Sequence, residues 1–107
     1  MRQDFPAELY ERAHTSVEEK KELIPLAYWL YYLSNIARSE GLLALEDYID
    51  IYNHDLLKVG LDQVISGIDP LYIERRLLTR LFTTDCHGIG MLKRMIIIKG
   101  VLEIQAG

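Results

Sequence analysis

The 107-residue sequence is 50% hydrophobic and 26% charged, a balance typical of a folded globular protein rather than a disordered one. Its length predicts a single domain over residues 1–107, and the patterns along the chain predict that this domain is soluble and helical. The net charge of −4 at pH 7 argues against nucleic acid as a partner, because general nucleic-acid-binding domains usually carry a basic surface. Cys86 has no second cysteine with which to form an intrachain disulfide, which fits a reducing compartment. Residues 1–6 lack the apolar run of a signal peptide, so we expect a cytoplasmic protein.

The first forty residues predict a short helix followed by a longer one. Pro6 suits the first turn of a helix over residues 7–13. Ser16 and Glu19 form a capping-box pattern, which predicts a helix that starts there and runs to about residue 39. Pro25 lies inside that segment, so it either kinks the helix or marks its true start.

Residues 23–37 form the most apolar window of the chain. A membrane-spanning helix needs about 20 apolar residues, and this window is shorter and contains Pro25. We therefore expect no membrane span and interpret the window as a largely buried core helix. The alternative is a contact with a membrane surface or a partner, made through the aromatic side chains of Tyr28, Trp29, Tyr31 and Tyr32.

The middle of the chain predicts three helical segments separated by turn signals. Apolar residues at positions 42, 45, 49 and 52 fall on one face of the first segment, which follows a glycine at position 41. Asp55 is the expected N-cap of the second segment, and Gly67 is its expected stop. Asp69 and Pro70 suit the N-cap and the first position of the third segment, which precedes a loop over residues 83–90.

The last segment, residues 91–105, is compatible with two kinds of secondary structure. Its run Met95–Ile98 is apolar and largely β-branched, which is typical of a buried strand. We favour a helix, because a lone strand would leave its backbone groups unpaired. The sequence as a whole thus predicts an all-α fold, a compact bundle of about five or six helices, some of them short.

Three blocks of sequence carry a resemblance to a known family. Ala37–Glu46 reads ARSEGLLALE, Leu57–Pro70 reads LKVGLDQVISGIDP, and Arg94–Gly107 reads RMIIIKGVLEIQAG. In this order they resemble the cytoplasmic region of a flagellar motor stator A subunit (MotA-like), within the MotA/TolQ/ExbB proton channel family. The first block is the most specific, because it is similar to the family signature A-R-x-E-G-L-L-A-L-E.

The chain also departs from that family. In stator A subunits the third and fourth membrane helices separate the second and third blocks, whereas here only residues 78–93 lie between them. The resemblance therefore implies no ion conduction by this chain. It divides the chain into residues 1–36 without a motif, a MotA-like block over residues 37–82, and a second over residues 91–107. A natural soluble relative and an excised cytoplasmic region remain equal alternatives.

The resemblance also implies candidate site residues. Arg38 and Glu46 match the arginine and the glutamate with which stator A subunits are thought to contact the charged domain of the rotor switch protein, FliG. On a continuous helix, two residues eight positions apart lie about 12 Å apart along the axis and about 80° apart in rotation. Gly41 lies between them and can bend this path. From the resemblance we expect a non-catalytic, motility-related protein-interaction module without a cofactor, at or near the inner face of the cell membrane.

Two alternatives come from residues outside these blocks. Cys86 and His87 could form a nucleophilic pair, or a metal site with His54, but adjacent residues need not meet in space and the spacing is not that of metal-ligand pairs. We therefore interpret them as ordinary loop residues. The alternative function is a soluble homo-oligomer, structural or regulatory, that associates through Trp29 and its neighbouring tyrosines. Self-association is also an implication of the resemblance, because stator A subunits form rings.

Overall fold

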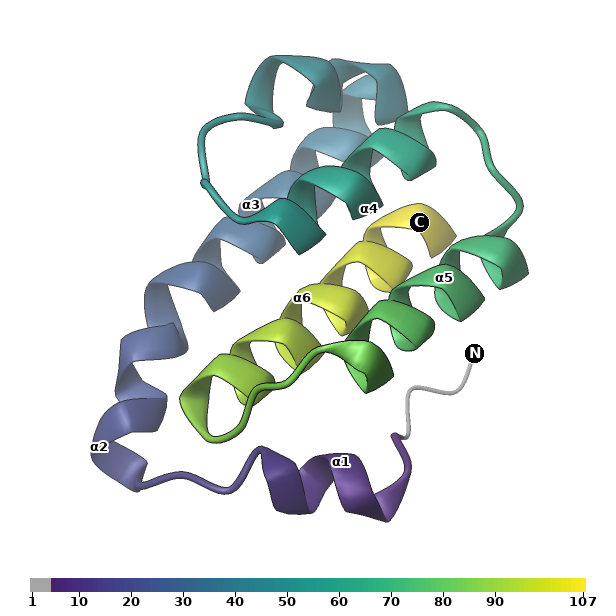
Figure 1. Cartoon of the computed structure of the whole chain (residues 1–107). Helices are drawn as coiled ribbons and strands as arrows, with labels where there is room; N and C mark the ends of the chain where they lie inside the picture. The colour runs from purple at the N-terminus through teal and green to yellow at the C-terminus, as the bar shows by residue number, and fades with distance from the viewer. Residues whose placement is uncertain (1–4) are drawn as a thin grey trace.

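Helix α6 (Ile89–Ala106) lies at the centre of the fold in a computed structural model, which describes residues 5–107 (Figure 1). It packs against α3 (Ile24–Glu40), α4 (Asp55–Ile65) and α5 (Pro70–Thr83). A helix that is apolar on several sides belongs in the interior. Accordingly, its side chains supply a third of the buried apolar core, namely Met91, Met95, Ile97, Ile98, Val101, Leu102 and Ile104.

The helical prediction for this segment is therefore confirmed, and the strand alternative is wrong. The β-branched residues at positions 96–98 favour a strand by local propensity, but burial against three neighbouring helices outweighs a preference of this size. The all-α fold is also confirmed. Among the described residues the elements are six α-helices and two 3-10 helices: α1 (Ala7–Arg12), α2 (Val17–Lys20), η1 (Lys21–Leu23), α3, η2 (Leu42–Tyr48), α4, α5 and α6.

The N-terminal region begins as predicted and then differs. Ser16 and Glu19 form the expected capping box, with the Glu19 backbone N–H donating to Ser16 Oγ at 3.1 Å. The α-helix that starts there ends at Lys20, however, and continues through the 3-10 turn η1 into α3, where Pro25 occupies the first turn. The structure lies between the two alternatives for Pro25, because α3 begins one residue before it while the backbone on its N-terminal side is also helical. Proline removes a backbone donor and clashes with the preceding turn, so it is tolerated only near a helix N-terminus.

The segment after Gly41 is a 3-10 helix, η2, where the sequence pattern predicted an ordinary helix face. Gly41 ends α3 with φ 93° and ψ 161°, a conformation essentially restricted to glycine. Within η2, only Leu45 is fully buried, and its partly buried neighbours Leu42 and Tyr48 lie three residues away on either side. A spacing of three matches the three residues per turn of a 3-10 helix.

Helix termini in the second half are set mainly by local signals. Asp69 caps α5 as predicted, accepting a hydrogen bond from the Leu71 N–H at 2.8 Å. The N-cap of α4 is His54, not Asp55, because His54 Nδ1 accepts from the Leu56 N–H at 3.2 Å. The predicted stop at Gly67 is confirmed, since this residue follows the C-cap of α4 with φ 74°.

Helix α1 is attached to the loop between α5 and α6. The Arg12 guanidinium donates to the carbonyl oxygens of Thr84, at 2.5 Å, and Cys86, at 3.2 Å. The Gly88 N–H donates in return to the Arg12 carbonyl at 2.6 Å. These bonds satisfy carbonyl groups beyond the end of α5 that have no helical partner.

Candidate functional site

The two charged residues singled out by the resemblance lie on different elements. Arg38 is exposed in the last turn of α3, where a cation interacts favourably with the helix dipole. Its Nη2 donates to Asn35 Oδ1 at 2.9 Å, one turn earlier. Glu46 is exposed on η2, beyond the turn at Gly41. The continuous helix assumed for their spacing is therefore wrong, because Gly41 redirects the chain between them.

Both charges are displayed to solvent. The ion pairs within residues 5–107 are Lys21 with Glu18, at 3.5 Å, and Lys58 with Asp50, at 3.7 Å. Neither Arg38 nor Glu46 belongs to a pair. Burial would have made these charges expensive to leave unpaired, but exposed charges remain hydrated and available to a partner.

The surroundings of Arg38 and Glu46 are acidic. Residues 38–55 hold five carboxylates and a single arginine. The pKa of Tyr48 on η2 is raised above its ordinary value, first by hydrogen bonding with the Tyr32 hydroxyl and further by the charges of Glu40 and Asp47. We call the exposed side chains of Arg38, Glu40, Glu46 and Asp47 the α3–η2 corner. This corner combines one exposed guanidinium with three carboxylates.

An aromatic cluster fixes η2 against α3. The Trp29 ring stacks on Tyr32 at a centroid distance of 5.5 Å, and Tyr48 of η2 meets both rings, at 6.1 Å and 5.9 Å. Aromatic pairs in such geometries are worth about 0.5–1.5 kcal/mol beyond their buried area. The cluster therefore holds the chain in place directly beside the α3–η2 corner.

The remaining aromatic residues of α3 are not part of this cluster. Tyr28 is 70% exposed and Tyr31 is 64% exposed, and Ile24 on the same helix is 50% exposed. The aromatic group that the sequence presents as one set thus divides in two. Trp29 is a packing residue, whereas Tyr28 and Tyr31 face solvent.

No hydrogen bond joins the side chains of Cys86 and His87 among residues 5–107. Cys86 is partly buried, and its Sγ accepts from Arg94 Nη1 at 3.4 Å. His87 is exposed and makes no hydrogen bond to Cys86 among the described residues. Across residues 5–107, no group of three or more histidine, cysteine, aspartate or glutamate side chains is placed to hold a metal ion, so His54 does not join these two residues in a metal site.

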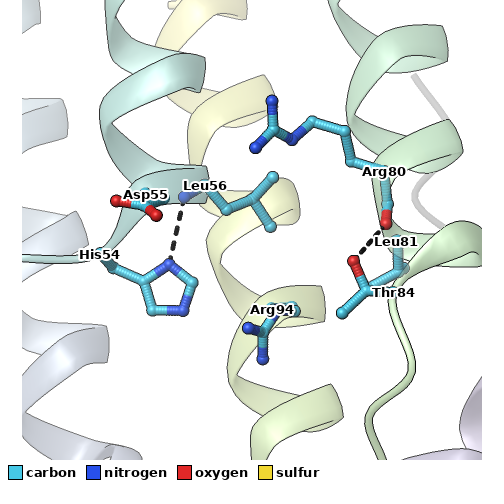
Figure 2. Close-up of a pocket in the computed structure, with 7 residues that line it drawn as sticks. All are labelled: His54, Asp55, Leu56, Arg80, Leu81, Thr84 and Arg94. Atoms are coloured by element: carbon cyan, nitrogen blue, oxygen red, sulfur yellow. Dashed lines mark hydrogen bonds between the residues drawn. The ribbon is translucent and has the colours of Figure 1, made fainter.

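A cavity of about 130 Å³ lies between the first turn of α4 and the last turn of α5, with α6 behind it (Figure 2). It is lined by His54, Asp55, Leu56, Arg80, Leu81, Thr84 and Arg94. Only His54 and Asp55 of this set stand out in the sequence, as a candidate metal ligand and a candidate cap. The two arginines carry no motif, and only the packing of α4 and α5 on α6 brings them together.

Comparison with known proteins gives no relative for this chain: no family model matches it, and neither a curated protein nor a solved structure does. The part of the chain from residue 5 onward contains no helix of sufficient length and apolarity to cross a membrane.

Proposed function

We propose that this protein is a stator-like cytoplasmic module of a flagellar motor, which contacts a charged rotor switch protein through Arg38 and Glu46. The observation that carries the proposal is the presentation of these two side chains. Both are exposed, and neither is neutralised by an ion pair within residues 5–107. The three sequence blocks that resemble the stator family supply the identity of the partner.

The electrostatics of the α3–η2 corner suit such a contact. Its carboxylates would attract a basic patch on the partner, while Arg38 would address an acidic residue beside that patch. Each exposed ion pair contributes less than about 1 kcal/mol and is screened by salt. A few such pairs give an association that forms and dissociates quickly, as a contact with a moving rotor requires.

The direct test is a binding titration of the protein against the C-terminal charged domain of a FliG-like rotor switch protein, at low and at moderate salt. We expect saturable binding that weakens as salt increases. Arg38→Glu and Glu46→Lys should each weaken binding by about three- to tenfold, as expected for the loss of a pair and the gain of a repulsion. Glu46→Lys should keep the wild-type unfolding midpoint, because Glu46 is exposed and unpaired. Arg38→Glu should lower the midpoint slightly, by the equivalent of about 1 kcal/mol, because it places a carboxylate in the last turn of α3.

Arg75→Glu provides the matched control, because Arg75 is an exposed arginine on α5, away from this corner. The control should bind like the wild type. Equal affinity of the wild type and both corner variants would refute the assignment of Arg38 and Glu46.

A second candidate function is self-association through α3. It is favoured by the exposed apolar and aromatic surface of Ile24, Tyr28 and Tyr31, which runs along one side of that helix. A groove beside Tyr31, between α3 and α6, extends this surface. Light scattering over a range of concentrations tests it. A dimer that dissociates in Tyr28→Lys/Tyr31→Lys would support self-association, and a monomer at every concentration would exclude it.

A further inference from the structure

We propose that the cavity between α4 and α5 is a binding site for a phosphate group. This proposal goes beyond the rotor contact and does not depend on it, because the cavity and the α3–η2 corner share no residue. The volume of about 130 Å³ is sufficient for a small tetrahedral oxyanion.

The positive charge of the cavity comes from two helices. Arg80 extends from the last turns of α5 and Arg94 from α6, and Figure 2 shows both side chains bordering the space in front of α6. The Arg80 guanidinium makes no hydrogen bond or ion pair with any other residue in the range 5–107. Guanidinium groups bind phosphate oxygens with planar, charge-assisted hydrogen bonds, so the exposed and unpaired Arg80 is free to contact an anion in the cavity.

Arg94 is held in place for such a role. Its Nη1 donates to the Gly90 carbonyl at 3.1 Å and to Cys86 Sγ at 3.4 Å. These contacts fix one nitrogen of the guanidinium and leave its other N–H groups for a ligand. Because the side chain is already ordered, little conformational entropy is lost when an anion binds.

His54 and the start of α4 add neutral donors. The Leu56 N–H donates to His54 Nδ1, so the ring proton of the neutral imidazole resides on Nε2, which can donate to a ligand. The N-terminus of α4, an 11-residue helix, contributes partial positive charge at the same edge of the cavity. The pKa of His54 is lowered first by burial and then by the charges of Arg94 and Lys93, while Asp55 opposes the shift; the smaller contribution of the two cations is consistent with positive charge at this position.

One carboxylate, Asp55, also borders the cavity and opposes an anion. It forms no salt bridge with Arg80 or Arg94. In Figure 2 it lies on the far side of Leu56 from Arg80. The two arginines and one aspartate therefore leave a net positive lining, and Asp55 should moderate the affinity for phosphate rather than prevent binding.

The test is a titration of the full chain with inorganic phosphate near pH 7, in which binding is monitored by the NMR signals of the backbone amides. Sodium chloride keeps the ionic strength constant throughout the titration. We expect saturable shifts at the amides of Leu56, Thr84 and Arg94 and a dissociation constant in the millimolar range or tighter. Arg80→Gln and Arg94→Gln should each weaken binding at least tenfold. Asp55→Asn should tighten it, which is a gain that a purely structural role of the lining residues would not produce.

Arg76→Gln is the matched control, because Arg76 is an exposed arginine of α5 that does not line this cavity. Glycerol 3-phosphate tells the two sources of the phosphate group apart: tighter binding than inorganic phosphate would indicate a phosphorylated metabolite, and equal or weaker binding would indicate free phosphate. Chemical-shift changes that do not saturate would overturn the proposal in favour of general charge screening. An equal loss of phosphate affinity in Arg76→Gln and Arg80→Gln would do the same. Because Arg80 is exposed, its variant should fold even if Arg94→Gln does not.

Discussion

Gly100 of α6 lies directly against Leu30 of α3. A Cβ atom added at Gly100 would come within 2.7 Å of Leu30 Cδ1 and 3.2 Å of Leu30 Cγ. Leu30 is buried, with only 7% of its surface exposed, so its side chain would have to shift within the contact between α3 and α6. Glycine at position 100 therefore allows this close approach of the central helix to α3, and a larger residue requires Leu30 to move.

We predict that Gly100→Ala destabilises the protein although alanine is the better helix former. Alanine gains about 1 kcal/mol of helix propensity, whereas overpacking a buried contact costs about 1–3 kcal/mol. Gly90→Ala in the same helix is the control, because its added Cβ would have no neighbour closer than 3.6 Å. Urea unfolding should give a lower midpoint for Gly100→Ala than for Gly90→Ala, and the reverse order would show that α3 and α6 are not packed as described.

A similar prediction applies to Gly60, where α4 meets α6. An added Cβ would lie 3.0 Å and 3.1 Å from the two γ-methyl groups of the buried Val101. A β-branched side chain is stiff about χ1, so valine cannot easily rotate away. Gly60→Ala should destabilise the protein by about 1 kcal/mol or more, and the loss in the double variant Gly60→Ala/Val101→Ala should be smaller than the sum of the two single losses. Additive losses would mean that the two residues do not touch.

The third prediction concerns pH. Burial, Arg94 and Lys93 lower the folded-state pKa of His54, and only Asp55 opposes them. In the unfolded chain a histidine titrates near pH 6.5, so between the folded and the unfolded pKa the unfolded state binds more protons. Stability should therefore be fully present above about pH 6.5 and decrease as pH falls toward the folded pKa. Protonation of Nδ1 would also remove the acceptor for the Leu56 N–H.

His54→Asn separates titration from capping. Asparagine is a good N-cap, so the start of α4 should be kept while the titrating group is removed. Urea unfolding of both proteins between pH 7.5 and pH 5.5 should show a smaller loss of stability in the variant. Equal slopes would mean that His54 does not contribute to the acid sensitivity of the fold.

Local signals in the sequence predict the helix termini better than they predict the helix types. The Asp69–Pro70 start, the Gly67 stop and the Ser16 capping box are all confirmed, because each depends on residues within one turn. The 3-10 geometry of η2 could not be predicted from its apolar spacing alone, since positions 42, 45 and 49 fit a regular helix equally well. The central position of α6 explains why its β-branched run forms a helix despite local propensity.

The candidate sites also differ in how far the sequence alone could predict them. Arg38 and Glu46 could be named from a short contiguous block, although their relative placement depends on the turn at Gly41. The phosphate cavity could not be predicted, because His54, Arg80 and Arg94 are far apart in the chain and meet only when α4 and α5 pack on α6. No spacing rule in the sequence connects residues joined by tertiary packing.

The last prediction concerns the turn that shapes the α3–η2 corner. Gly41 has φ 93° and ψ 161°, a region that glycine alone readily occupies, whereas Gly67 follows a helix C-cap with φ 74°. At Gly67 the N–H groups of Gly67 and Ile68 donate to the carbonyls of Val64 and Gln63, which is the Schellman arrangement that also tolerates asparagine. Thermal unfolding should therefore show a larger loss of stability for Gly41→Asn, about 1–3 kcal/mol, than for Gly67→Asn. Neither position has a neighbour within 4 Å of an added Cβ, so a steric clash cannot account for the difference. Equal losses in the two variants would indicate that the chain at Gly41 can adopt another conformation, and the placement of Glu46 relative to Arg38 would then not be set by this turn.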